Sequence, residues 1–138
     1  MRLNLKAFHI IRFRNQASGA APILESVGAT GTPDWRINGR IGLAMGPFDF
    51  DVNVIWTSAT KLDLLATNED LAPEINNVPS YTLVNTSLGV HINEQFTLQF
   101  SVRNLFDRDV PFPGVVQSLY SIFDPIGRTY TATASVRF

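Results

Sequence analysis

The sequence alternates between apolar and polar residues at every second position, and this period limits the folds open to the chain more than any other feature. In residues 48–57, one alternate set consists of Phe48, Phe50, Val52, Val54 and Trp56, and the other of Asp49, Asp51, Asn53, Ile55 and Thr57. Successive side chains of a β-strand point to opposite faces of a sheet, whereas a helix would spread both sets around its circumference. The segment is therefore predicted to be a strand with one apolar and one polar face.

Six segments share this period, which predicts an all-β chain folded as an antiparallel up-and-down meander. The expected strands are residues 2–13, 35–45, 48–58, 81–92, 95–104 and 128–138. Every second residue counted from Leu3, Trp35, Phe48, Thr82, Phe96 and Tyr130 forms a set without Asp, Glu, Lys or Arg. We call this set the apolar face; its one ionisable member is His9. The intervening residues form the polar face.

The lengths of the segments and of their connections favour a membrane β-barrel over a soluble sandwich, which shows the same alternation. The segments run to ten to twelve residues, as tilted membrane strands of ~9–11 residues do, whereas globular strands average ~5–6. The links at 46–47 and 93–95 are short, and those at 14–34, 58–81 and 104–128 are long and rich in turn-forming residues. Outer-membrane barrels have short periplasmic turns and long extracellular loops.

Aromatic side chains on the apolar face point the same way, because they concentrate where hydrocarbon meets lipid headgroups. Those expected near the long loops are Phe13, Trp35, Trp56 and Tyr130. Those expected near the short turns are Phe48, Phe96 and Phe138. The two groups predict two belts, one at each end of the strands.

Composition argues against several other functions. The 11 Lys+Arg and 12 Asp+Glu residues give a formal net charge of −1, without the basic surplus typical of nucleic-acid binding. There is no cysteine, and the two histidines, His9 and His91, fall on opposite faces, so no metal or catalytic cluster has a recognisable spacing. Ser87 and His91 lie ~13 Å apart along one strand, too far for a nucleophile and its base. We expect no enzyme activity, catalytic residue or cofactor.

The last third of the sequence carries motifs that identify a family. One predicted strand ends in Asn104-Leu105-Phe106-Asp107, a long loop follows, and Gly127-Arg128 opens a last strand that finishes in Phe138. This succession resembles the closing region of the TonB-dependent outer-membrane receptors. The resemblance covers most of the chain, is strong from Ser80 onward and is weaker before Gly31. It implies a segment of a 22-stranded barrel, a type of outer-membrane transporter whose lumen holds a plug.

The resemblance also implies a function and a set of partners. Such a receptor sits in the outer membrane of a Gram-negative cell and actively takes up a scarce nutrient of the siderophore-iron, cobalamin or glycan class. Its partners are membrane lipid, the remaining strands and plug, TonB through an N-terminal part, and the outer-membrane assembly machinery through the last strand. We expect residues 1–138 to be one C-terminal barrel segment without the plug, not competent for transport alone, whose export signal lies upstream.

Charged residues of the polar face are predicted to line the lumen. They are Arg36, Arg40, Asp49, Asp51, Arg103 and Arg137. The four arginines have two alternative sets of partners, plug carboxylates or Asp49 and Asp51 on a neighbouring strand. For Asp49 and Asp51 we expect pairing with the neighbouring strand that carries Arg40. Acidic residues of a long loop, Asp63, Glu69, Asp70 and Glu74, are more simply explained as solvated than as ligand contacts. The alternative for the whole chain is a small soluble β-barrel or sandwich that binds an apolar ligand.

Overall fold

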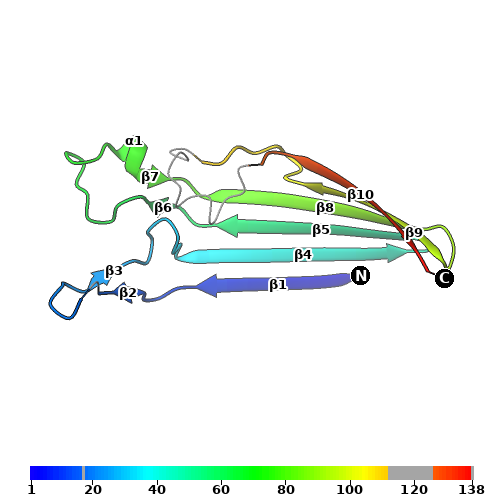
Figure 1. Cartoon of the computed structure of the whole chain (residues 1–138), viewed down its shortest axis with the longest axis horizontal. Helices are drawn as coiled ribbons and strands as arrows, with labels where there is room; N and C mark the ends of the chain where they lie inside the picture. The colour runs from blue at the N-terminus through cyan, green and yellow to red at the C-terminus, as the bar shows by residue number, and fades with distance from the viewer. Residues whose placement is uncertain (17, 112–125, 138) are drawn as a thin grey trace.

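A computed structural model describes residues 1–16, 18–111 and 126–137 and is built around one antiparallel sheet of six strands (Figure 1). The strands lie in the order β1-β4-β5-β8-β9-β10, each beside its neighbour in the meander. Their bounds are β1 Arg2–His9, β4 Trp35–Met45, β5 Phe48–Thr57, β8 Tyr81–His91, β9 Phe96–Arg103 and β10 Thr129–Val136. The all-β meander predicted from the sequence is confirmed.

Smaller elements gather at the end of the sheet where the long connections lie, on the left of Figure 1. Two two-residue ladders occur there, formed by β2 (Arg14–Asn15) with β3 (Leu24–Glu25), and by β6 (Thr60–Lys61) with β7 (Asn77–Val78). The single turn of helix α1, Pro73–Asn76, precedes β7. The short turns lie at the opposite end of the strands.

The register of the sheet places all apolar alternate positions on one face. One row of Cα partners crosses all six strands through Leu3, Ile41, Val52, Thr86, Val102 and Tyr130. The adjacent row, on the other face, runs through Arg2, Gly42, Asp51, Ser87, Ser101 and Thr131. Because a slip of one residue would exchange the faces of a strand, this agreement across five pairings shows that the two faces belong to the whole sheet.

The same row reveals a stagger between the two edges of the sheet. Leu3 is the second residue of β1 and Tyr130 the second residue of β10, although the two strands run in opposite directions. The row therefore starts near the short-turn end of β1 and finishes near the long-loop end of β10. Such a stagger accompanies the strand tilt that closing a barrel requires.

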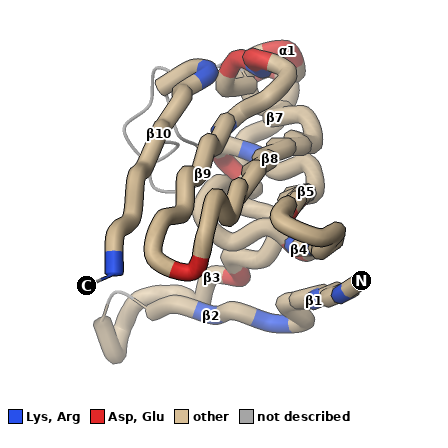
Figure 2. The backbone as a smooth tube through the Cα atoms, turned by 90° about the vertical axis from the view of Figure 1, so that its right-hand side faces the viewer, with Lys and Arg blue, Asp and Glu red and all other residues tan. Residues whose placement is uncertain are grey.

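The sheet is a single curved layer rather than half of a sandwich. Figure 2 shows its strands following an arc, and mainly polar-face residues line an open hollow of about 1020 Å³. No second sheet covers the apolar face within the described residues. Large side chains exposed on that face include Leu3, Leu5, Trp35, Ile41, Met45, Phe48, Phe50, Val54, Leu88, Phe100, Tyr130 and Val136.

The buried core is small and lies at the long-loop end. Val78 and Tyr81 are 1% and 5% exposed, and Leu62, Leu83 and Val110 pack against them. Tyr81 and Leu83 occupy polar-face positions of β8, so loop segments fold onto the concave side at this end. The apolar face of the sheet takes no part in this core.

The first predicted strand is longer than the observed one. β1 ends at His9, because its partner β4 begins at Trp35 and, among the described residues, no strand lies opposite residues 10–13. Only the bond from the Ile10 N–H to the Asp34 carbonyl extends the ladder. Phe13 consequently lies outside the six-stranded sheet, beyond the long-loop end of β1.

The other predicted strand bounds agree with the structure to within two residues. Phe138, the last predicted strand residue, lies outside the described residues.

At the end of the β1–β4 ladder, His9 stacks on Trp35 with ring centroids 4.1 Å apart. No described helix is long and apolar enough to cross a membrane.

The turn between β4 and β5 depends on the backbone freedom of glycine. Gly46 has φ +57° and precedes Pro47, between the paired residues Met45 and Phe48. A two-residue hairpin with glycine first and a negative φ second corresponds to a type II′ turn, whose twist matches that of the strands. The turn fixes the β4–β5 register, and with it the face on which Arg40 lies.

Replacement of Gly46 by alanine is expected to lower the free energy of unfolding by about 1–2 kcal/mol, because a Cβ is disfavoured at positive φ. Gly19→Ala is the matched control: no heavy atom lies within 4 Å of its added Cβ, and its φ is not positive. Urea titrations of the chain refolded in detergent micelles, followed by tryptophan fluorescence, measure both variants. Equal midpoints for the two variants would contradict the turn assignment.

Candidate functional site: the polar face and the loop junction

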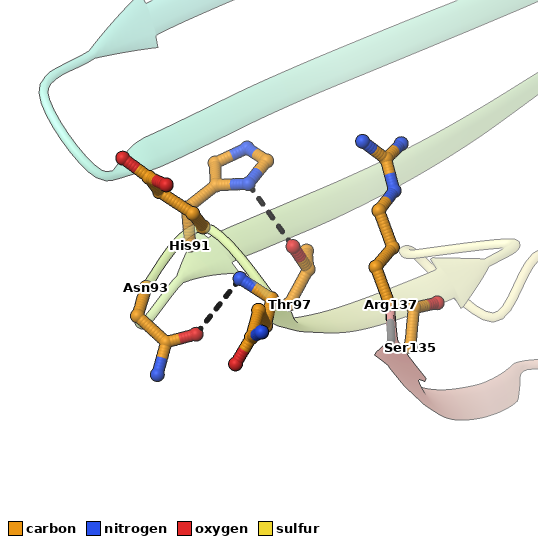
Figure 3. A pocket seen from close by; sticks show the side chains of 7 residues that line it. His91, Asn93, Thr97, Ser135 and Arg137 are labelled. Carbon is orange, nitrogen blue, oxygen red and sulfur yellow. Dashed lines mark hydrogen bonds between the residues drawn. The ribbon is translucent and has the colours of Figure 1, made fainter.

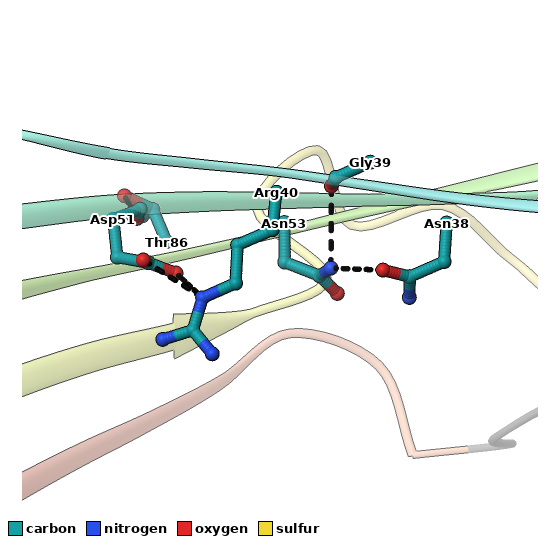
Figure 4. A network of polar contacts seen from close by, with 6 residues as sticks. All are labelled: Asn38, Gly39, Arg40, Asp51, Asn53 and Thr86. Atoms are coloured by element: carbon teal, nitrogen blue, oxygen red, sulfur yellow. Dashed lines mark hydrogen bonds and ion pairs between the residues drawn. The ribbon is translucent and has the colours of Figure 1, made fainter. Parts of the chain in front are cut away.

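A polar network joins the middle of β4, β5 and β8 (Figure 4). Arg40 Nε lies 2.8 Å from each carboxylate oxygen of Asp51. Beside this ion pair, the Asn53 amide donates to Asn38 Oδ1 at 3.1 Å and to the Gly39 carbonyl at 3.3 Å. The predicted pairing of Asp51 with the Arg40 strand is confirmed.

Asp49 pairs in the other direction, with β8 instead of β4. Its Oδ2 lies 2.6 Å from His91 Nε2, and His91 Nδ1 lies 3.1 Å from Thr97 Oγ1 on β9. The prediction of an Arg40-strand partner for Asp49 is therefore wrong. The antiparallel register places Asp49 opposite Gly89 of β8, which has no side chain, so the carboxylate reaches the next polar-face residue of that strand.

His91 and Thr97 line a small pocket of about 570 Å³ at the short-turn end (Figure 3). Ser135 and Arg137, at the end of β10, also line the pocket, and Figure 3 shows them on the side away from His91. Hydrolases also contain an aspartate, a histidine and a hydroxyl in this order. In this chain the hydroxyl is that of Thr97, within strand β9. Within the described residues, no group of three His, Asp or Glu side chains is arranged to hold a metal ion.

The remaining predicted lumen residues are spread along the polar face. Arg36 lies on β4 opposite Phe8 of β1 and Thr57 of β5. Arg103 ends β9 opposite Thr129. The structure thus places the six residues on one face but does not gather them into one site.

The Asn104–Asp107 motif forms a compact junction where β9 leaves the sheet. Asn104 and Asp107 both have φ +52°, a left-handed conformation that asparagine and aspartate tolerate better than most residues. Asn104 is 4% exposed. Its Oδ1 accepts the Arg108 N–H at 2.8 Å, its Nδ2 donates to the Arg108 carbonyl at 2.9 Å, and its N–H donates to Asn85 Oδ1.

The second half of the motif attaches the start of β10 to this junction. Asp107 Oδ1 accepts the Arg128 N–H at 2.8 Å, and its other oxygen lies 3.5 Å from the Arg128 guanidinium. A Cβ added to Gly127 would meet Asp107 Oδ1 at 3.0 Å, so a side chain there would crowd the carboxylate. The motif residues brought together by the fold are thus Asn104, Asp107, Gly127 and Arg128.

Leu105 and Phe106 have different places in the junction. The Leu105 N–H donates to the Val84 carbonyl at 2.8 Å and so continues the β8–β9 ladder by one bond. Phe106 is exposed. Phe138, the remaining motif residue, lies outside the described part of the chain.

Carboxylates of the long loops serve local structure. The Phe13 N–H donates to Glu25 Oε1 at 2.7 Å and holds the pKa of that carboxyl below its usual value. The Thr67 hydroxyl and N–H donate to Asp70 Oδ2 and lower the pKa of Asp70 in the same way. Asp63, Glu69 and Glu74 are exposed. The four acidic residues of the 58–81 loop, Asp63, Glu69, Asp70 and Glu74, do not converge on a site.

Comparison of the fold with solved structures identifies its type. Two structures of variants of the ferric enterobactin receptor PfeA from Pseudomonas aeruginosa match it, with TM-scores of 0.52 and 0.53 and 17% and 19% sequence identity. Each match covers 82% of this chain and 19% of the receptor, so the chain spans about a fifth of the receptor's length. The chain has the fold of a TonB-dependent receptor barrel segment. No protein family and no curated protein matches the sequence.

Two residues that hold the junction of this barrel segment together, Asn85 and Tyr81, were not predicted from the sequence. Asn85 accepts the Asn104 N–H, and the Tyr81 hydroxyl donates to the Arg108 carbonyl at 3.2 Å. Both residues lie on the polar face of β8, the strand that precedes β9, and this position is the sequence feature that could have indicated their role. Their partners lie 19 and 27 residues away, and no local pattern specifies such pairs.

Two substitutions at Asn104 separate its hydrogen bonds from its backbone conformation. Asn104→Gly removes the side-chain bonds but tolerates φ +52°, and is expected to cost about 1–3 kcal/mol of unfolding free energy. Asn104→Ala removes the same bonds and adds backbone strain, for a further cost of about 1 kcal/mol. The measurement is urea denaturation of the micelle-refolded chain. An alanine variant as stable as the glycine variant would show that the left-handed conformation is not required.

Proposed function

We propose that this chain is part of the barrel of a TonB-dependent receptor of the Gram-negative outer membrane, which imports a scarce nutrient. In this proposal the apolar face contacts lipid acyl chains, and the polar face, with Arg36, Arg40, Asp49, Asp51 and Arg103, lines the lumen. Arg137 lies at the periplasmic rim. Such a segment supports binding and passage of a nutrient and performs no catalysis.

One observation carries this proposal: in the described part of the chain, the sheet has an uncharged convex face that no second layer covers and a hydrophilic concave face. In a soluble protein, exposing so many large apolar side chains would be unfavourable, since apolar surface removed from water contributes about 25 cal/mol per Å². The register excludes charge from the apolar face across all six strands. A bilayer outside and a wet lumen inside suit these two faces.

The partners follow from the two open edges. Among the described residues, β1 and β10 each pair with one strand of the sheet, and closing a barrel takes ~8 strands or more. We propose that further strands of a receptor barrel pair with these edges and that a plug occupies the enclosed lumen. Energy transfer would then use TonB, through parts of the receptor outside this chain. Recognition by the assembly machinery would use the last strand, β10.

The nutrient class is proposed from the fold likeness. The matching structures are described as ferric enterobactin receptors, which favours a siderophore-iron complex among the classes that also include cobalamin and glycans. The long connections, at the end of the sheet that carries the small Val78–Tyr81 core, would form part of the outer vestibule. The soluble ligand-binding module considered from the sequence has no support in the fold, because the described residues form no second layer over the apolar face.

Lipid contact can be tested directly with the two tryptophans. Trp35 and Trp56 occupy apolar-face positions near the long-loop end of β4 and β5. In vesicles that contain brominated phosphatidylcholine, we expect the fluorescence of both to be quenched relative to ordinary lipid. A chain that stays monomeric in water without detergent, with both tryptophans insensitive to brominated lipid, would overturn the proposal.

Two neighbouring residues of β10 form a matched pair for a substitution test. Ala132 lies on the apolar face opposite Phe100, and Thr133 on the polar face opposite Gln99. Ala132→Arg is expected to weaken insertion into the bilayer by about 2–4 kcal/mol, because it places a charge in hydrocarbon. Thr133→Arg should change insertion by less than about 0.5 kcal/mol.

Flotation of the chain with phosphatidylcholine vesicles over a urea series measures both variants. Equal losses for the two variants would contradict the assignment of the faces.

A further inference from the structure

The one ionisable side chain of the apolar face, His9, lies against an indole ring. His9 and Trp35 are Cα partners and form the last pair of the β1–β4 ladder. The angle between their ring planes is 5°, and the ring centroids lie 4.1 Å apart. Both residues are exposed, Trp35 to 40%, so water reaches the imidazole and can supply or remove a proton.

The contact with Trp35 is the interaction of His9 that responds to its charge. Within the described residues, the His9 side chain makes no hydrogen bond and no ion pair. The neighbouring charged residues of the two strands, Lys6 and Arg36, belong to the opposite face. Arg12 and Asp34 lie in the connection beyond the ladder. A proton gained by His9 therefore acts mainly on the stack.

The stack lies at the base of the β2–β3 hairpin, which extends beyond the end of β1 (Figure 1). Past the stack, one backbone hydrogen bond continues the ladder, from the Ile10 N–H to the Asp34 carbonyl at 2.9 Å. The stack and this bond together join the segment that enters the hairpin to the start of β4.

The hairpin makes its other hydrogen bonds close to itself. The Phe13 N–H donates to Glu25 Oε1 at 2.7 Å, and the Ser26 N–H donates to the Phe13 carbonyl at 2.7 Å. Among the described residues, backbone bonds to the next long loop begin only at Gly28, whose carbonyl accepts the Lys61 N–H. The attachment of the hairpin at its entry therefore depends on the stack and on the one ladder bond beside it.

We propose that His9 and Trp35 form a proton-sensitive clasp, which holds the β2–β3 hairpin to the sheet more firmly when His9 is protonated. An imidazolium over the face of an indole gains a cation–π attraction that the neutral ring lacks. Histidine is the side chain whose charge changes between about pH 5 and pH 8. The added stabilisation is present at the acidic end of this range and is lost as the pH rises through it.

The position of the clasp suits a residue that changes its charge. It ends the ladder on the long-loop side, where the proposed membrane boundary carries aromatic residues. A charge deep in hydrocarbon would be unfavourable, whereas at this boundary water reaches the ring. The role of the clasp rests on the proposed function, because the hairpin would then belong to the outer vestibule. The clasp would make the attachment of that part of the rim depend on the acidity of the medium.

Hydrogen exchange of the chain refolded in zwitterionic detergent micelles tests the clasp. The readout is the protection factor of the Ile10 amide, whose bond lies beside the stack and which is corrected for the intrinsic exchange rate at each pH. We expect it to be about two- to fivefold higher at about pH 5 than at about pH 8, as the cation–π attraction of an exposed pair predicts. The Leu105 amide, bonded to the Val84 carbonyl elsewhere in the sheet, is the internal control and should keep its protection.

Two histidine substitutions form a matched pair. His9→Gln should remove the difference in Ile10 protection between the two pH values. His91→Gln removes the other histidine, on the polar face at the opposite end of the strands, and should keep the difference. In a Trp56→Phe background, Trp35 is the one remaining tryptophan. Its fluorescence should fall with pH, because a protonated imidazole in contact quenches an indole, and should not do so after His9→Gln.

Three results would overturn the clasp. They are an Ile10 protection factor in the unsubstituted chain that does not change with pH, a change that survives His9→Gln, and a change that disappears in His91→Gln. Protection of the Leu105 amide shows whether the sheet of each variant is folded. If a variant does not fold, the titration of the unsubstituted chain decides.

Lipid contact is measured separately, so that the clasp and the barrel function can fail independently. The readout is quenching of Trp56 by brominated lipid in a Trp35→Phe chain. Quenching together with pH-independent protection of Ile10 rejects the clasp alone, whereas loss of quenching rejects the barrel function.

Discussion

The hydrogen-bond register between neighbouring strands is the constraint on which the rest of the structure depends. Side chains alternate faces along a strand, so each pairing must keep the parity that sets Leu3 beside Ile41 and Arg2 beside Gly42. The two-residue turn at Gly46 fixes this parity for β4 and β5, and the Asn104–Asp107 junction ends the β8–β9 ladder and binds the start of β10. A slip at either place would put charge on the apolar face.

Buried side chains of the described residues pack at the long-loop end of the sheet, whereas the middle of the strands leaves both faces open. Buried side chains occur only around Val78 and Tyr81 among the hydrophobic residues described, where loops cover one end of the concave face. Along the strands, both faces are open, and each has a distinct chemistry: hydrocarbon-like on the convex side, hydrophilic on the concave side. A curved, staggered single layer of this kind is suited to being one wall of a barrel, with lipid against one side and a polar occupant against the other.

The polar face shows how strongly the pairing of charges depends on local geometry. Arg40 reaches Asp51 because the two residues lie diagonally across the tight β4–β5 hairpin, and proximity in the sequence makes that pairing foreseeable. Asp49, two residues away, finds Gly89 opposite on β8 and meets His91, 42 residues distant in the chain. Parity in the sequence showed that Asp49 and His91 share a face, but their contact depends on the β5–β8 register across a long loop.

The sequence by itself determined the strands, their faces and the end of the chain that carries the family motifs, because these depend on period two and on local turn chemistry. Five of the six strand positions agree with prediction to within two residues; β1 stops early at His9, since a strand continues only where a partner lies beside it. The tertiary structure alone decided which polar residues meet. The Asp49–His91 contact and the placing of Lys6 beside Arg36 each require two strands joined by a long loop to settle into one register. The Asn85–Asn104 bond depends in the same way on the register of β8 and β9. The energy that selects that register is shared over whole ladders, so no single stretch of sequence specifies it.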